Sequence, residues 1–158
     1  MWFDEFKTPI GLLRVAVDAE ELHYVLFEMN KHEPPHVGDW LRDRGATREV
    51  REQLLQYFER DRSEFELKLS LAGTEFQKRT WQMLASIPYG ETWSYAELAT
   101  SIGSPIAVRA VGSANGRNPL PIVLPCHRVI GMNGALTGFG GGLPAKKWLL
   151  EHEGYLSE

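Results

Sequence analysis

Apolar and polar residues alternate over the first thirty positions of the chain, which predicts short strands with one buried face. Leu13, Val15 and Val17 share a face of one such strand, and a turn at residues 8–11 precedes it. A second apolar run, residues 22–27, follows a polar turn. Because the runs are short and closely connected, we expect a small antiparallel sheet.

Beyond the sheet the pattern changes to helical spacing and then back to alternation. Thr47 stands at a capping position, ahead of apolar residues spaced for one face of a helix: Val50, Leu54, Leu55 and Phe58. Residues 64–69 alternate again and predict a further strand, whereas the proline-containing segment 32–38 is expected to be a loop. Three histidines lack metal co-ligands and are interpreted as structural or exposed: His23, His32 and His36.

The second half of the chain carries clear signals for the ends of helices. Two capping boxes, at residues 74–77 and 94–97, each predict the start of a helix. Gly103 can end the second helix, and Ser104 followed by proline is expected to cap and start a third. Short helices joined by a glycine turn predict a helix-turn-helix. A last helix is expected over residues 144–153.

The third helix is rich in small side chains: Ala107, Ala110, Gly112, Ser113 and Ala114. A reader of the major groove needs long polar side chains that reach base edges, and here only Arg109 is long. The composition fits a helix that approaches the minor groove closely. It fits equally well a helix that is packed tightly on its neighbour.

Together these elements predict an α+β protein in two parts. We expect a small antiparallel β-sheet subdomain with no recognisable chemistry, residues 1–73, followed by a mainly helical, winged-helix-like subdomain, residues 74–158. A chain of 158 residues is long enough for two such parts.

Charge is distributed unevenly between the two parts. The net charge is −4, and residues 1–73 hold ten Lys and Arg against fifteen Asp and Glu. Residues 98–150, by contrast, contain five basic residues and no acidic one. A stretch without carboxylates suits an anionic ligand such as a nucleic acid, and a solvated basic face would have the same composition.

No apolar run approaches the ~20 residues of a membrane span, and the N-terminus lacks the pattern of a secretory signal. We therefore expect a cytoplasmic protein with no membrane partner. Cys126 is the only cysteine, so neither an intramolecular disulfide nor a thiolate-rich zinc site can form. We expect no metal and no cofactor.

Cys126 follows an apolar stretch, residues 120–124, and Pro125, where the chain must leave regular structure. A lone cysteine is usually a small buried hydrophobe. Here His127 and Arg128 follow at once, and neighbouring positive charge favours the thiolate, which is the nucleophilic form. Adjacent residues of an extended chain point apart, so we expect His127 to act through a water or a turn.

Two further features accompany Cys126. The segment 138–142 consists of four glycines and Phe139, so its backbone can lie against a ligand while the ring supplies a flat apolar wall. Glu153 lies near the end of the last helix, where the helix dipole favours a cation. Such a carboxylate is often functional, and a solvated helix end is the alternative interpretation.

These motifs resemble those of a known family. The run NPLPIVLPCHRVI at residues 118–130 is similar to the active-site signature of O6-alkylguanine-DNA alkyltransferases. Further elements match in order and spacing: Ser94-Tyr95, RAVG at residues 109–112 and LLEHEG at residues 149–154. The resemblance is specific over residues 74–154 and weak over residues 1–73.

The resemblance implies that residues 74–158 form a DNA-binding and alkyl-acceptor domain. Cys126 would accept the alkyl group after activation through water by His127, which Glu153 orients. Asn118 would lie in the turn between the recognition helix and the active-site strand and hold both together.

For DNA, the resemblance implies that the helix-turn-helix enters the minor groove. Arg109 would replace the flipped-out guanine in the stack, Tyr95 would crowd the phosphate that rotates, and Ser104 at a helix N-terminus would suit a phosphate oxygen. The remaining DNA- or substrate-binding residues would be Arg128 and those around the extruded base: Val129, Phe139 and Gly140. Many relatives carry tyrosine at the position of Phe139, so a hydrogen bond from that side must come from backbone.

The implied function is direct-reversal DNA repair by a monomer. Each molecule would transfer one methyl or other alkyl group, irreversibly, from O6-alkylguanine in double-stranded DNA to Cys126. The preferred alkyl size and activity on O4-alkylthymine stay open. One alternative is a lesion-recognising DNA-binding protein without transfer, but such proteins replace the acceptor cysteine. The other is a thiol hydrolase that uses Cys126 and His127 and turns over.

Overall fold

The computed structural model describes residues 1–29 and 33–156, which form two compact units, Met1–Leu71 and Ala72–Glu158. The first unit contains β1 (Trp2–Thr8), β2 (Gly11–Asp18), β3 (Glu21–Phe27), the 3₁₀ helix η1 (Val37–Asp39), β4 (Leu41–Arg42) and α1 (Arg48–Phe58). The second contains α2 (Glu75–Leu84), β5 (Trp93–Ser94), α3 (Tyr95–Ser101), α4 (Val108–Gly116), the 3₁₀ helix η2 (Cys126–Arg128), β6 (Val129–Ile130) and α5 (Leu143–His152). The predicted α+β class is confirmed.

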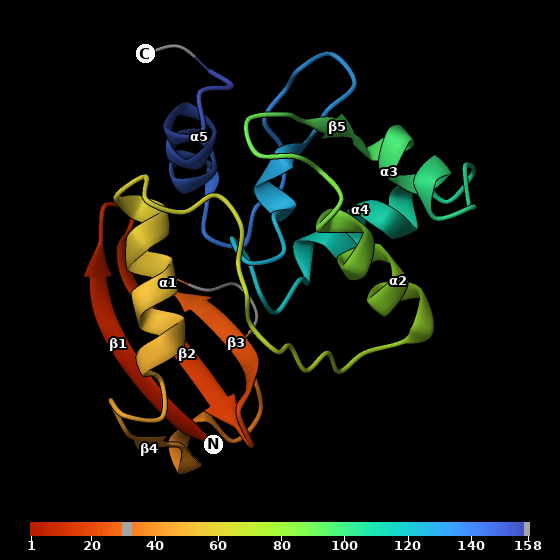
Figure 1. Cartoon of the computed structure of the whole chain (residues 1–158). Coiled ribbons are helices and arrows are strands. Elements are labelled where there is room, and N and C mark those ends of the chain that lie inside the picture. Colours follow the sequence, from red (N-terminus) through yellow and green to blue (C-terminus); the bar gives the residue numbers. More distant parts are fainter. Residues whose placement is uncertain (30–32, 157–158) are drawn as a thin grey trace. The chain divides into compact units, whose positions relative to one another are not determined.

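The sheet of the first unit has the strand order β3-β2-β1-β4. The predicted antiparallel pairing of β1, β2 and β3 is confirmed, and the short β4 adds a parallel edge. Leu13, Val15 and Val17 are buried as their alternation predicted. Helix α1 crosses one face of the sheet (Figure 1) and buries one side of its own: Val50, Gln53, Leu54, Tyr57 and Phe58.

Two local predictions for this unit are wrong. Only Leu69 of residues 64–69 pairs, through a single bridge to Leu22. The side-chain amide of Gln53 occupies both backbone groups of Glu66, at 3.1 Å from its Nε2 to the carbonyl and 2.9 Å from the backbone nitrogen to its Oε1. Backbone groups satisfied by a side chain are not left for a strand partner. Thr47 precedes α1, but its hydroxyl donates to the carbonyl of Asp43 instead of capping the helix.

The histidines of this unit are placed as expected where the structure describes them. His23 is half-buried in β3 and His36 is exposed. His32 lies outside the described residues.

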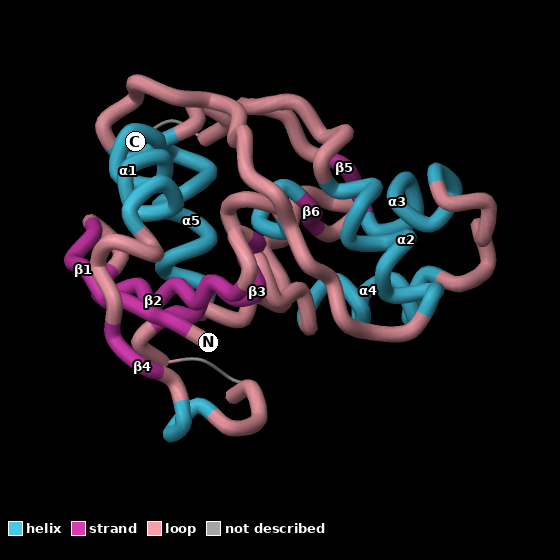
Figure 2. Tube along the Cα trace, turned by 60° about the horizontal axis from the view of Figure 1, so that its bottom comes forward, coloured by secondary structure: helices cyan, strands magenta, loops and turns pink. Residues whose placement is uncertain are grey.

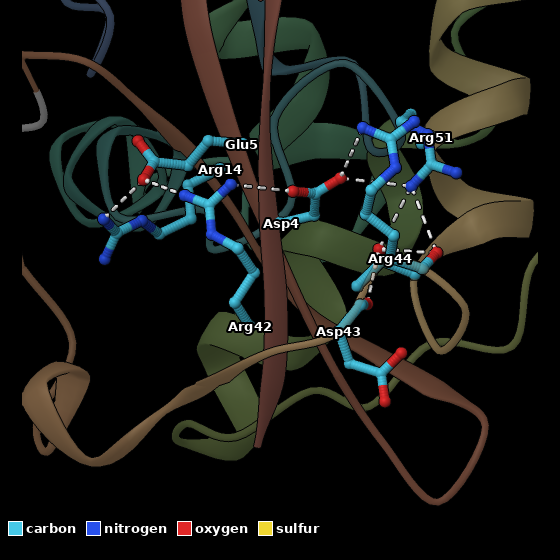
Figure 3. A network of polar contacts seen from close by, with 8 residues as sticks. Asp4, Glu5, Arg14, Arg42, Asp43, Arg44 and Arg51 are labelled. Atoms are coloured by element: carbon cyan, nitrogen blue, oxygen red, sulfur yellow. Dashed lines mark hydrogen bonds and ion pairs between the residues drawn. The ribbon is translucent and has the colours of Figure 1, made fainter.

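A buried carboxylate ties the start of the sheet to α1 (Figure 3). Asp4 of β1 is fully buried and lies 3.2 Å from both Arg42 and Arg51, and 3.8 Å from Arg44. Arg42 also contacts the neighbouring carboxylate of Glu5, at 3.2 Å. A buried charge is tolerated only when it is paired, so this network fixes β1, β4 and α1 around Asp4.

In the second unit both predicted capping boxes are confirmed, at Thr74 with Gln77 and at Ser94 with Glu97. Figure 2 shows α2, α3 and α4 grouped together, and the indole of Trp81 joins α2 to α4 by donating to the carbonyl of Ala114 at 2.7 Å. A parallel pair of short strands, β5 and β6, completes the winged-helix-like arrangement.

The third predicted helix begins later than expected. Gly103 follows the end of α3 with a φ of 79°, a conformation that glycine adopts easily. Residues 104–107, however, form a turn in which the backbone nitrogen of Ala107 donates to the carbonyl of Ser104 at 2.9 Å. Helix α4 therefore starts at Val108. The error is explained by Pro105, because proline suits the second position of a turn as well as the first position of a helix.

The last helix, α5, starts one residue before its predicted bound, and Gly154 follows it with a φ of 84°. Within residues 1–29 and 33–156, no helix is long and apolar enough to cross a lipid bilayer.

Candidate active site

The segment that leads into Cys126 is a tight loop rather than the strand that was expected. The Oδ1 atom of Asn118 accepts from the backbone nitrogen of Leu120 at 3.0 Å, and its Nδ2 atom donates to the carbonyl of Leu124 at 2.7 Å. Within the loop, buried Ile122 has a φ of 74°, which a β-branched residue rarely adopts. Asn118 therefore holds both ends of a strained loop, whereas the resemblance implied that it joins the recognition helix to the active-site strand.

Cys126 begins η2 and is only 4 % exposed. Burial raises the pKa of its thiol to about 11, although a hydrogen bond with Asn118 and the charge of Lys146 act in the opposite direction. The expectation that His127 and Arg128 favour the thiolate is therefore wrong for the resting protein, because both side chains are engaged elsewhere. In the resting site the sulfur carries a proton.

His127, Arg128 and Glu153 form a buried cluster. The Nε2 atom of His127 lies 2.7 Å from Oε2 of Glu153, and the carboxylate also accepts from Arg128 at 2.8 Å and 3.0 Å. Burial opposes ionisation of Glu153, but the hydrogen bonds and charges of His127 and Arg128 outweigh it and hold the pKa of Glu153 well below its ordinary value. The cluster therefore contains a carboxylate even in mildly acidic solution.

Burial also lowers the pKa of His127, against the opposing effect of Glu153, so its imidazole is neutral at neutral pH. A neutral ring that donates from Nε2 to the carboxylate leaves Nδ1 as an acceptor. This Nδ1 atom is buried without a hydrogen-bond partner among the described residues. It is thus available to accept a proton, and it belongs to the residue that follows Cys126.

The burial of Arg128 argues against the substrate-binding role expected for it. Besides Glu153, its guanidinium donates to the carbonyl of Ile87 at 2.7 Å, and the residue is only 6 % exposed. Val129 is likewise fully buried, so its side chain offers no wall to a base. Both residues are part of the buried interior of the site and do not line its surface.

Lys146 was assigned no role from the sequence, yet the structure places it close enough to Cys126 for the two to interact electrostatically. Its Nζ atom donates to the carbonyls of Val129 and Thr137, at 2.6 Å and 2.7 Å, and so links α5 to the glycine-rich loop. Burial lowers the pKa of Lys146 to about 8, and the nearby Cys126 acts in the opposite direction. A lysine at helical spacing from the apolar Leu149 and Leu150 was the available signal.

Tyr95, at the start of α3, reaches the same loop. Its hydroxyl donates to the carbonyl of Thr137 at 3.1 Å and accepts from the hydroxyl of Thr137 at 3.3 Å. Gly138 follows with a φ of 49°, and Phe139 and Gly140 are half-buried. The residues expected around an extruded base are therefore held beside Tyr95 and Lys146.

The small residues of α4 are divided between its two sides. Ala114 is buried with Val111 and Asn115, which fits tight packing on a neighbour, whereas Arg109, Ala110 and Ser113 are exposed. Arg109 makes no hydrogen bond or ion pair with any residue that the structure describes. Ser104 is half-buried and lies one turn before α4, so its predicted place at the N-terminus of that helix is wrong.

Both units match models of one protein family. Residues 75–155 match the 6-O-methylguanine DNA methyltransferase, DNA binding domain, and residues 3–71 match the ribonuclease-like domain of the same family. The methylated-DNA–protein-cysteine methyltransferase of Methanosarcina acetivorans is 47% identical over 154 residues, which cover 98% of this chain and 99% of that protein. The Mycobacterium leprae protein of the same name is 51% identical over 146 residues, 92% of this chain and 88% of its own.

Among solved structures, the crystal structure of Mycobacterium tuberculosis OGT in complex with DNA has a TM-score of 0.93 at 45% identity and covers 98% of this chain and 93% of its own. The chain belongs to the 6-O-methylguanine DNA methyltransferase family. The enzyme class predicted from the motifs around Cys126, a methylated-DNA–protein-cysteine methyltransferase, is confirmed with it. The first unit matches the family as well, although it carries none of those motifs.

Proposed function

We propose that this protein repairs DNA by moving an alkyl group from O6 of a guanine in double-stranded DNA onto the sulfur of Cys126. The observation that best supports this is the buried contact between Glu153 and His127, the residue after Cys126, because the Nδ1 atom of His127 then has no hydrogen-bond partner among the described residues. In this proposal residues 74–158 form the domain that binds DNA and accepts the alkyl group.

The proton on Cys126 must leave during the reaction, because its raised pKa keeps the resting site protonated. The Nδ1 atom of His127 takes this proton through one water, and Glu153 stabilises the imidazolium that forms. The sulfur then attacks the alkyl carbon; the carbon–sulfur bond forms as the carbon–O6 bond breaks. The bonding electron pair stays with O6, and the guanine takes up one proton, which the imidazolium of His127 returns through water, so that the proton lost by Cys126 is accounted for.

Access to Cys126 requires the damaged base to leave the duplex. The thiol is almost fully buried, and a base inside a stack cannot reach it. Exposed Ala110 and Ser113 allow α4 to approach the minor groove. Arg109 takes the place of the flipped base, Tyr95 crowds the rotating phosphate, and the base rests against Phe139 and Gly140.

Counting turnovers tests this proposal. The thioether on Cys126 is stable and no second cysteine can regenerate it, so an excess of duplex with a single O6-methylguanine should lose one methyl group per protein molecule. Continued turnover would instead identify a thiol hydrolase. No transfer, together with tight binding of the methylated duplex, would identify a lesion-binding protein.

The matched control is Cys126→Ala. We expect this variant to transfer nothing while it still binds the duplex, because phosphate and groove contacts supply the affinity.

A further inference from the structure

We propose that Ile106 is an apolar probe that enters the minor groove of the duplex and packs against its deoxyribose walls. The inference rests on the proposed function and assigns a residue that the motifs of the sequence left out. Ile106 is 98% exposed, and Val108, two residues later, is 36% exposed. Isoleucine is among the residue types most often buried in proteins, and Ile106 is almost fully exposed on a structured turn inside the part of the chain that matches a DNA-binding domain.

The turn that carries Ile106 holds it in a defined place. Figure 1 shows this turn as the connection between α3 and α4. It follows Gly103, whose φ is 79°, and the backbone nitrogen of Ala107 closes it by donating to the carbonyl of Ser104 at 2.9 Å. Pro105 fixes one further backbone angle. The result is an apolar tip with a restricted backbone.

Its surroundings identify duplex DNA as the occupant. Ile106 lies within residues 75–155, which match the family's DNA-binding domain, and three residues before the exposed Arg109. No carboxylate occurs between residues 98 and 150 to repel phosphates. Ala110, which is also exposed, adds little bulk to the first turn of α4. Proteins that bind the minor groove frequently place apolar side chains, isoleucine among them, in that groove.

The chemistry of isoleucine determines what this contact can do. A β-branched side chain has few rotamers, so little conformational freedom is lost when it is buried. It cannot bind a phosphate or read a base edge, so it adds affinity without adding salt dependence or sequence preference. Ile106 therefore favours a duplex over a single strand, whereas Arg109 fills the place that the flipped base leaves in the stack.

Comparison of Ile106→Ala with Leu41→Ala tests the inference. Leu41 is 66% exposed in the first unit and controls for the loss of any exposed apolar side chain. We expect Ile106→Ala to weaken binding of undamaged and O6-methylguanine duplexes about tenfold, the scale of one buried aliphatic side chain. The slope of affinity against salt concentration should not change, and Leu41→Ala should bind as the unchanged protein does.

Three results would overturn the inference. One is an affinity of Ile106→Ala within about twofold of the unchanged protein, a small difference on the scale of binding energies. The second is an altered salt slope, which would indicate an electrostatic role. The third is self-association that Ile106→Ala abolishes, since the tip would then be covered by a second copy of the chain.

Reaction with free O6-methylguanine base separates this inference from the proposed function. In the Ile106→Ala variant, methyl transfer from the free base to Cys126 should proceed at the unchanged rate, because the free base has no minor groove for Ile106 to contact. If neither protein reacts with base or duplex, the proposed function fails, while the affinities still test Ile106. If both react and their duplex affinities agree, only the inference about Ile106 fails.

Discussion

Each unit of the protein buries one carboxylate among cations, and the two clusters have different partners. In the first unit Asp4 faces three arginines: Arg42, Arg44 and Arg51. In the second unit Glu153 faces Arg128 and His127. Arginine keeps its proton in proteins, whereas histidine exchanges one near neutral pH. The same electrostatic arrangement therefore stabilises the fold of the first unit and, in the proposed reaction, prepares His127 of the second unit to accept a proton.

The two clusters also differ in exposure. The side chains of Arg42 and Arg44 are 57% and 70% exposed, so water would solvate them if Asp4 were lost, and only that of Arg51, at 11%, is largely buried. Those of Arg128 and His127 are 7% and 0% exposed. Loss of the carboxylate of Glu153 would leave a buried guanidinium without its counter-charge, which is a larger penalty.

Glu153→Gln should give the largest effect. The single-turnover rate of methyl transfer should fall about a hundredfold or more, the scale of general acid–base catalysis. The loss should be equal for duplex and free base, because Glu153 acts on the chemistry and not on DNA. The free energy of unfolding should fall by about 3–5 kcal/mol, because Arg128 loses its buried partner. Rates measured in quenched-flow at a temperature where the variant is folded check this; an unchanged rate would reduce Glu153 to a structural role.

Asp4→Asn is the matched change in the first unit. We expect the free energy of unfolding to fall by about 1–3 kcal/mol, because hydrogen bonds to charged groups are lost and Arg51 stays partly buried. The rate of methyl transfer by the folded variant should not change. Urea unfolding and the single-turnover assay measure both quantities, and a slowed transfer would contradict the contrast between the clusters.

Arg109→Ala sharpens the comparison, because Arg109 has no carboxylate partner in the described chain. We expect transfer from duplex to slow about tenfold or somewhat more, the scale of the unstacking that the arginine offsets. Transfer from free O6-methylguanine should be unaffected. Equal losses on both substrates would mean that Arg109 acts in chemistry or folding.

The thiol of Cys126 can also be tested without a substitution, through the pH dependence of its alkylation. Because burial raises the pKa of Cys126 to about 11, the thiolate fraction should increase about tenfold per pH unit as the pH rises from neutral towards that value. The rate of modification by a small alkylating reagent, followed by intact mass, should rise in proportion. A rate that is already constant at neutral pH would show that the site holds a thiolate.

Local signals in the sequence predicted much of this fold. The alternation around Val15 placed the sheet, and the capping boxes at Thr74 and Ser94 placed two helices, because each depends on residues a few positions apart. The strand at residues 64–69 failed because the competing partner, Gln53, is distant in sequence. The start of α4 failed because Pro105 fits two local structures.

The site was predictable as a set of residues more than as a set of contacts. Family motifs named Cys126, His127 and Glu153, and their spacing could not show which atoms meet. The resemblance implied that Arg128 binds DNA or substrate, yet its guanidinium donates to Glu153 and to the carbonyl of Ile87. Lys146 escaped notice because a lysine on a helix is normally solvated. In both cases the side chain is buried by partners that are distant in the sequence, which a local motif cannot show.

The most direct test of the account is to locate the transferred group. After reaction with a duplex that carries isotopically labelled O6-methylguanine, the protein would be digested and the masses of its peptides measured by mass spectrometry. We predict that the peptide containing Cys126 is heavier by one labelled methyl in place of hydrogen, that the label is on sulfur, and that no other peptide carries it. Label on His127 or elsewhere, or a peptide of unchanged mass after the methyl group has left the DNA, would contradict transfer to Cys126.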